Sequence, residues 1–192
     1  MQEIELKAWD YDTEKTEKAL KTFATFAGTS FKSDRYFIQQ NPPQEELRLR
    51  TQKDFKPSAG SVQNGEPEEN CTFWVTHKKR FKQNGIEQNE ETEFSVSDGA
   101  AFEKVLYTIG FKLKRTKEKK TGNWYYQNFH IETVELTGLG NFVEIETVLQ
   151  NPGQEETAAA KQNLLKILQK CRIDAHNIEE KSYSRLLEEK NL

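Results

Sequence analysis

Cysteine is scarce in this chain of 192 residues, and its placement excludes a cysteine-based metal site. The two cysteines, Cys71 and Cys171, stand far apart and show no metal-binding spacing. The sequence also begins without a recognisable signal peptide. Few cysteines and no leader together predict a reduced, cytoplasmic compartment.

Long apolar runs and an excess of one charge are missing as well. No apolar run approaches the roughly 20 residues that a membrane-spanning helix needs, so a membrane is not an expected partner. The formal net charge is only -3, so no basic field indicates nucleic acid as a partner. We find no internal repeat of fixed period.

Charged and aromatic residues are abundant instead. Hydrophobic residues make up 34% of the chain and charged residues 31%, and the mean hydropathy is -0.90. The 12 Phe, 6 Tyr and 3 Trp are nevertheless too many for a disordered chain. Both facts are explained if many charges line an internal cavity. The length predicts a single domain over residues 1–192.

Residue spacing predicts more strands than helices. Alternation predicts strands over 3–9, 29–38, 46–50, 71–80, 89–94, 111–120, 124–129, 131–136 and 141–148, with a turn at 121–123. Apolar stripes and capping residues predict helices over about 12–26, 98–108 and 155–171, and a short one in the tail. Residues 53–70 read as a polar loop. Short turns between most strands predict a mainly antiparallel α+β fold.

Five of these strands carry charged residues, largely sorted by sign, on one face and apolar residues on the other. For any single strand, a charged face in water is the simpler explanation. Five strands sorted by sign favour a curved or closed sheet with the charges inside, where they need partners or ligands. The pairs are Glu3-x-Glu5-x-Lys7, Arg48-x-Arg50, Thr76-x-Lys78-x-Arg80, Glu91-x-Glu93 and Glu144-x-Glu146.

Positively and negatively charged side chains suit different ligands. Arginine and lysine suit a polyphosphate, through bidentate contacts and point charges respectively. The candidates are Lys7, Arg48, Arg50, Lys78, Arg80 and two of Arg115, Lys117 and Lys119. Carboxylates suit hard divalent cations such as Mg²⁺ or Mn²⁺. The candidates here are Glu3, Glu5, Glu91, Glu93, Glu144 and Glu146.

This ordered set resembles the CYTH superfamily, the triphosphate tunnel metalloenzymes, over nearly the whole chain. Glu3-x-Glu5-x-Lys7 is similar to the family signature, and residues 139–146, Leu-Gly-Asn-Phe-Val-Glu-Ile-Glu, are very like its late strand. Residues 182–187, Ser-Tyr-Ser-Arg-Leu-Leu, resemble the tail of cyclase-like members. The resemblance implies an eight-stranded antiparallel closed β-barrel, open as a tunnel, with flanking helices.

The resemblance also implies roles for residues. It implies that Glu3, Glu5, Glu144 and Glu146 bind Mg²⁺ or Mn²⁺, with Glu91 and Glu93 nearby. Glu132 is expected in place of an Asp that many members carry. Triphosphate binding is expected at Lys7, Arg48, Arg50, Lys78, Arg80, Lys117 and Lys119, although residues 112–120 leave the register of that last pair open. The predicted catalytic residues are Glu5, Lys7 and Lys78, and Tyr183 is expected to close a tunnel mouth. Asn89 departs from the family pattern, where an Arg is common.

Three functions remain open from the sequence. The first is an adenylyl cyclase of class IV type, which converts ATP to cyclic AMP and pyrophosphate and is slightly favoured by the tail. The second is a triphosphatase acting on inorganic triphosphate, thiamine triphosphate or a nucleotide, and the third is a non-catalytic polyphosphate binder. A homodimer is possible.

Isolated histidines and aromatic residues carry weaker signals. His77, His130 and His176 are scattered and expected to be structural. Trp74, Trp124, Tyr125 and Tyr126 could stack a base, although packing is their simpler role.

Overall fold

The computed structural model describes residues 2–39, 46–56, 69–83 and 86–190, with the backbone alone described at 69, 78–83 and 86–91. The strands are β1 (Gln2–Trp9), β2 (Thr25–Gln39), β3 (Glu46–Phe55), β4 (Glu69–Gln83), β5 (Ile86–Val96), β6 (Phe111–Tyr126), β7 (Phe129–Leu136) and β8 (Gly140–Leu149). The helices are α1 (Thr13–Leu20), α2 (Gly99–Thr108), α3 (Gln154–Lys170) and α4 (Tyr183–Lys190), with a short 3₁₀ turn η1 (Ala175–Asn177).

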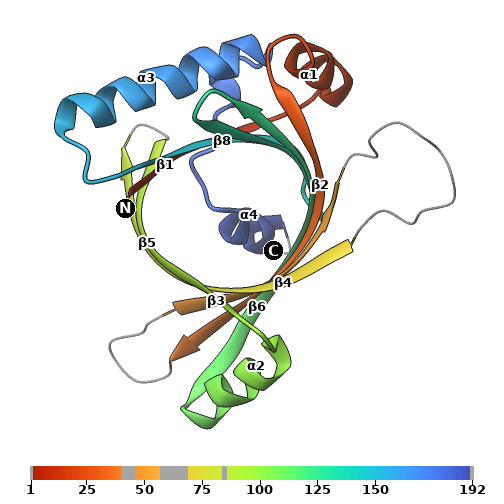
Figure 1. The fold of residues 1–192 in the computed structure, drawn as a ribbon, viewed down its shortest axis with the longest axis vertical. Helices are drawn as coiled ribbons and strands as arrows, with labels where there is room; N and C mark the ends of the chain where they lie inside the picture. Colours follow the sequence, from red (N-terminus) through yellow and green to blue (C-terminus); the bar gives the residue numbers. More distant parts are fainter. Residues whose placement is uncertain (1, 40–45, 57–68, 84–85, 191–192) are drawn as a thin grey trace, which may run out of the picture.

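Every pair of neighbouring strands is antiparallel, which confirms the predicted mainly antiparallel β fold with helices. Backbone hydrogen bonds join the strands in the order β1-β5-β4-β3-β2-β6-β7-β8, and β8 pairs with β1. The sheet therefore curls around an axis that Figure 1 views end-on. At this seam β1 pairs with β8 over eight residues and with β5 over five.

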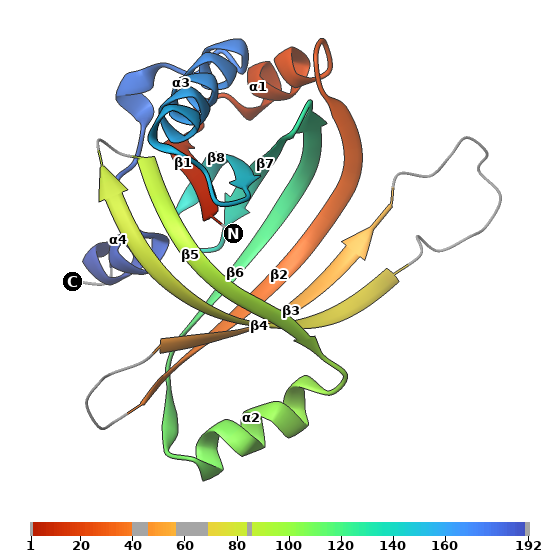
Figure 2. The same ribbon diagram turned by 60° about the vertical axis from the view of Figure 1, so that its left-hand side comes forward.

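The outer face of the sheet is apolar and is covered by helices. Ile4 and Leu6 on β1 are almost fully buried against Leu164 and Leu168 of α3. Figures 1 and 2 show α3 lying across the outside of β1 and β8. Burying each such side chain contributes about 1.5–3 kcal/mol, so this contact fixes which face of β1 points outward. Among the described residues, no helix is long and apolar enough to cross a membrane.

Two further helices cover other parts of the sheet. Leu106 of α2 packs with Phe37 and Leu49 on the outer side of β2 and β3. Tyr183 at the start of α4 packs with Phe142 in a separate apolar cluster at one end of the curl. The segment before α4 follows β1, where the Glu179 amide donates to the Lys7 carbonyl at 2.8 Å.

Two expected boundaries are wrong. The first helix ends at Leu20 instead of continuing to residue 26, because the chain enters β2 at Thr25. The turn expected at 121–123 is the middle of β6, and the actual turn follows at Gln127, which has a φ of 56°. Gly122 allows close strand packing, since a Cβ there would lie 2.6 Å from Oγ1 of Thr133.

Candidate active site

The inner face of the curled sheet carries the charged residues. On β1, the half-buried Glu3, Glu5 and Lys7 alternate with Ile4 and Leu6, which face the outer core. Because strand side chains alternate between faces, packing Ile4 and Leu6 against α3 places the three charged residues inside.

A cavity of about 210 Å³ lies within the curl. Among the side chains that the structure describes, its charged lining comes from seven of the eight strands. The charged lining residues are Glu3, Glu5, Lys7, Lys32, Arg48, Arg50, Glu93, Lys117, Lys119, Glu132, Glu144 and Glu146. The structure therefore brings most of the predicted site residues together, including Lys117 and Lys119 from the ambiguous run.

Three carboxylates form a compact group. Oxygen atoms of Glu3, Glu5 and Glu146 lie within 4.8 Å of one another, and Glu5 is paired with Glu146 across β1 and β8. Two oxygens on opposite sides of a Mg²⁺ stand roughly 4 Å apart, because each metal–oxygen bond is about 2.1 Å. The donor chemistry and spacing of this group therefore fit a hard divalent cation after a small contraction.

Two other predicted metal ligands, Glu132 on β7 and Glu144 on β8, contact lysines. Lys119 Nζ lies 2.7 Å from Glu132 and 2.5 Å from Glu144, and Lys32 also forms an ion pair with Glu132. Burial opposes ionisation of Glu132, but Lys119 and Lys32 outweigh it and hold its pKa well below the usual range. Burial lowers the pKa of Lys32, and Glu132 offsets this only in part.

The arginines of β3 are held by carboxylates. Arg50 donates to both oxygens of Asp34, at 2.6 and 3.0 Å, and Lys117 approaches the same carboxylate at 3.1 Å. Burial would raise the pKa of Asp34, but Arg50 and then Lys117 hold it well below its usual range. Arg48 donates to Glu93 at 3.2 Å, so Glu93 serves as a partner for a cation here.

Tyr36 on β2 is buried beside these cations. Its hydroxyl donates to Asp34 over 3.4 Å, and the ammonium of Lys117 lies 5.6 Å from the centre of its ring. Burial favours the neutral phenol, but Lys117 shifts the balance so that the pKa of Tyr36 is lowered.

Tyr183 of α4 lies at the end of the cavity where the cations gather. The ammonium groups of Lys7 and Lys117 lie 5.1 and 5.3 Å from its ring centre. Burial, and then the carboxylate of Glu144, raise the pKa of Tyr183 well above its usual value. Arg115 does not line the cavity but donates to Ser184 of α4 at 2.7 Å, and so helps to hold that helix in place.

Three predicted site residues lie outside the part of the chain whose side chains are described. These are Lys78, Arg80 and Glu91. Their backbone belongs to β4 and β5, where Lys78 is paired with Glu91.

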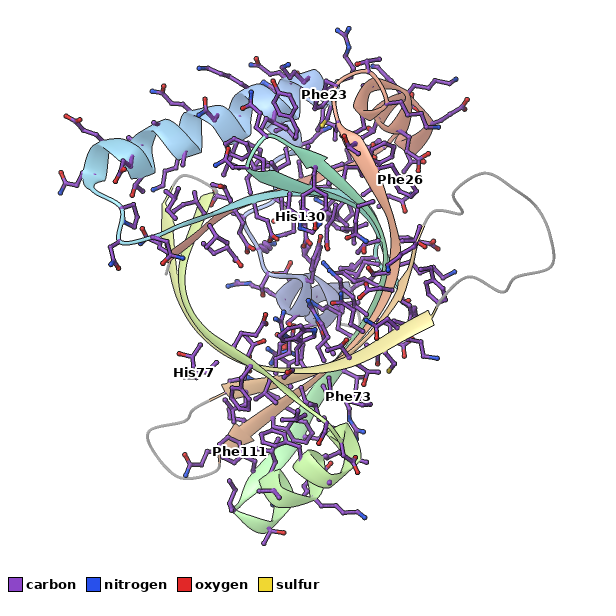
Figure 3. All side chains as sticks on the ribbon, in the orientation of Figure 1. Phe23, Phe26, Phe73, His77, Phe111 and His130 are labelled. Carbon is purple, nitrogen blue, oxygen red and sulfur yellow. The ribbon has the colours of Figure 1, made fainter. Side chains whose placement is uncertain are left out.

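Sequence reasoning missed the contribution of β2 and of one histidine. Lys32, Asp34 and Tyr36 all belong to the buried network. His130, expected to be structural, lies on the inner side of the ring of strands, as Figure 3 shows, and its Nδ1 is 2.9 Å from Glu146. The alternating Lys32-x-Asp34-x-Tyr36 pattern was a weak signal for the strand, whereas nothing local distinguished His130.

Comparison with known proteins shows what this arrangement is similar to. The profile of the CYTH domain family matches residues 1–183. The PH1819 protein from Pyrococcus horikoshii is 26% identical, with a TM-score of 0.79 over 98% of this chain and 99% of that chain.

Two more distant structures share the fold. A candidate adenylate cyclase from Vibrio parahaemolyticus is 15% identical, with a TM-score of 0.73 over 97% of both chains. The Hippeastrum protein HpAC1, a candidate adenylyl cyclase described as having a dominant triphosphatase activity, is 15% identical, with a TM-score of 0.60 over 100% of this chain and 96% of that chain. No protein with a curated description matches.

Proposed function

The chain belongs to the CYTH family, and we propose that it is a divalent-metal-dependent enzyme that acts on a triphosphate bound in the tunnel within its curled sheet. One observation carries the proposal: the Glu3, Glu5 and Glu146 carboxylates and a group of arginines and lysines line the same small cavity. A site that only bound anions would be weakened by so many carboxylates, whereas a site for a cation–triphosphate complex requires both signs.

The arginines and lysines of the cavity would contact the phosphates in different ways. Arg48 and Arg50 present planar guanidinium groups that can contact phosphate oxygens in pairs, and Lys7 and Lys117 supply point charges. Asp34 keeps Arg50 and Lys117 in place before the substrate arrives. Such fixed charges stabilise the charge that develops on the leaving phosphate without rearrangement.

The cation, Mg²⁺ or Mn²⁺, would be held by Glu3, Glu5 and Glu146 and would neutralise phosphate charge and acidify the attacking hydroxyl group. Glu144 and Glu132 reach the same cavity but are held by lysines, so their role is to position Lys119 toward the phosphates.

The preferred reaction is that of an adenylyl cyclase. The 3′-hydroxyl oxygen of ATP attacks the α-phosphorus, the bond to the β-phosphate oxygen breaks, and pyrophosphate leaves. The hydroxyl proton passes to a base in the cavity. Tyr36 is suited to this step because it lines the cavity and because the neighbouring Lys117 lowers the pKa of its phenol.

The same tyrosine would serve a second candidate, a triphosphatase. Here Tyr36 would take a proton from water, and the water oxygen would bond to a terminal phosphorus. The bond from that phosphorus to the bridging oxygen would break, so that orthophosphate and the remaining diphosphate group are released. The two reactions use the same charged lining and differ in whether a ribose hydroxyl or a water molecule occupies the position beside Tyr36.

A ³¹P NMR time course distinguishes these candidates. The purified protein is incubated with Mg²⁺ or Mn²⁺ and either ATP or inorganic triphosphate. Cyclic AMP and pyrophosphate identify the cyclase, and orthophosphate without a cyclic product identifies the triphosphatase. The matched variants Lys117→Met and Lys120→Met alter inward- and outward-facing lysines of β6, and we expect turnover to be lost only in the first. No metal-stimulated turnover of either substrate would refute the proposal and leave a binding protein.

A further inference from the structure

One end of the cavity is filled by packed aromatic side chains. Tyr183 is only 7% exposed, and its ring packs edge-on against Phe142 with the ring centres 4.9 Å apart. Trp9 also stacks on Phe142 at this end, at 4.1 Å. An organic group attached to the bound triphosphate would therefore extend toward the opposite end.

The opposite end begins at the carboxylate group. Glu146 follows Phe142 by four residues on β8, which is about 13 Å along a strand. Next to Glu146 across the sheet is His130 of β7, and next to His130 is Tyr125 of β6. The cavity therefore leads from the basic residues, past the three glutamates, to His130, whose ring lies against that of Tyr125.

This pair forms a fixed aromatic surface. The rings of His130 and Tyr125 are stacked, with centres 4.9 Å apart and an angle of 21° between their planes. The His130 ring is held on both sides, by Glu146 at 2.9 Å and by the Asn123 side chain at 3.3 Å. Tyr125 is nevertheless 51% exposed, which is unusual for an aromatic ring on the inner face of this sheet. One side of the ring is therefore covered by a held imidazole while much of the rest stays accessible.

We propose that Tyr125, supported by His130, is a stacking surface for a planar heterocyclic base attached to the triphosphate. The site would thus prefer a nucleoside triphosphate over inorganic triphosphate. This inference rests on the proposed function, because it assumes that the phosphates occupy the basic part of the cavity. Stacking of a base on an aromatic side chain is a common source of affinity that requires no particular base sequence.

Carboxylates around the tyrosine narrow the chemistry of the base. Asp54 accepts hydrogen bonds from Ser30 of the neighbouring strand β2 at 2.6 Å and from Gln52 of its own strand β3 at 2.9 Å. Ser30 also accepts a hydrogen bond from Asn123 at 2.8 Å, and Asn123 contacts His130, so Asp54 belongs to the same polar network as the stacked pair. Acceptor oxygens at the edge of the surface favour a base that carries an amino group, such as adenine.

Calorimetric binding tests the proposal. The affinities of an ATP analogue with methylene groups at both the α,β and β,γ bridging positions and of inorganic triphosphate are measured with Mg²⁺ for the unaltered protein and for Tyr125→Leu, Tyr125→Phe and Tyr107→Leu. Tyr107 is a matched control because it is 46% exposed on α2, outside the cavity. Base stacking on one aromatic ring corresponds to a loss of about 5-fold to 150-fold in affinity when the ring is removed.

We expect Tyr125→Leu to weaken binding of the ATP analogue by that factor and to leave the affinity for inorganic triphosphate unchanged. Tyr125→Phe and Tyr107→Leu should bind both ligands as the unaltered protein does. If Tyr125→Leu weakened the binding of both ligands equally, or did not weaken binding of the analogue, the stacking role of Tyr125 would be refuted while the proposed function stayed intact. Failure of the unaltered protein to bind either ligand would overturn the proposed function, and the stacking surface with it.

Discussion

Replacing Asp34 by Asn is predicted to destabilise the protein strongly although the side chain changes little in shape. The Asp34 carboxylate is fully buried and compensates Arg50 and Lys117, whose side chains are only 12% and 9% exposed. The amide of Asn can accept one hydrogen bond from Arg50 but carries no charge. Two nearly buried cations would then face each other without their shared carboxylate.

The size of the effect follows from that geometry. Removing one partner of a buried ion pair costs about 3–5 kcal/mol, because the remaining charge is left uncompensated. Arg50 and Lys117 line a cavity that water can enter, so we expect the lower end of that range, about 3 kcal/mol. For a protein of this size, that corresponds to a fall in Tm of roughly 6–12 °C.

Thermal unfolding followed by circular dichroism, with urea unfolding at 25 °C, measures this loss. A bound triphosphate should recover part of it, because its negative charge takes the place of the missing carboxylate. A loss below about 1 kcal/mol in the absence of ligand would refute the view that Asp34 compensates these cations.

The same residue gives a pH dependence of defined sign. The pKa of Asp34 in the folded protein lies well below the value of about 3.9 in an unfolded chain. Its stabilising effect is therefore complete above about pH 4 and is lost as the pH falls through the depressed folded value. Below pH 4, the unaltered protein should lose its stability advantage over Asp34→Asn; an advantage that persists unchanged at pH 2 would contradict the assignment.

Three other predictions follow from burial. Iodoacetamide at pH 8 should modify the exposed Cys71 and spare Cys171, since burial raises the pKa of the Cys171 thiol to about 12; mass spectrometry showing equal labelling would contradict this. Leu164→Ala should lower the free energy of unfolding in urea by about 2–5 kcal/mol, because the fully buried side chain joins α3 to β1, and a loss near zero would argue against that packing. Gly122→Ala should cost about 1–3 kcal/mol in the same assay, because its Cβ would meet Thr133, and an unchanged stability would mean that the strands can separate freely.

The fold was predictable where one strand face is strictly apolar. The alternation of Ile4 and Leu6 with Glu3 and Glu5 indicated which side of β1 faces the core, and the structure has the same arrangement. The turn expected around Gly122 was wrong, because a glycine within a strand that permits close packing looks the same in sequence as a glycine in a turn.

The site was predictable only in its charged strands. On β2, Ser33 and Arg35 occupy outward positions that are normally apolar, so the alternation that would have exposed Lys32 and Asp34 is blurred. The partners of Glu132 could not be inferred either, because Lys32 reaches it from a strand distant in sequence. The role of Glu132 in metal binding stays a prediction, and the structure shows this carboxylate in contact with two lysines.

The proposed function depends most directly on a cation that is bound by Glu3, Glu5 and Glu146 and contacts the triphosphate there. Electron–nuclear double resonance measures this contact for Mn²⁺ bound to the protein with an ATP analogue that has methylene groups at both the α,β and β,γ bridging positions. We predict a ³¹P hyperfine coupling typical of a direct Mn–O–P linkage, which disappears together with tight Mn²⁺ binding in Glu146→Gln. Tight Mn²⁺ binding without any ³¹P coupling, or binding that is unchanged in Glu146→Gln, would contradict the account.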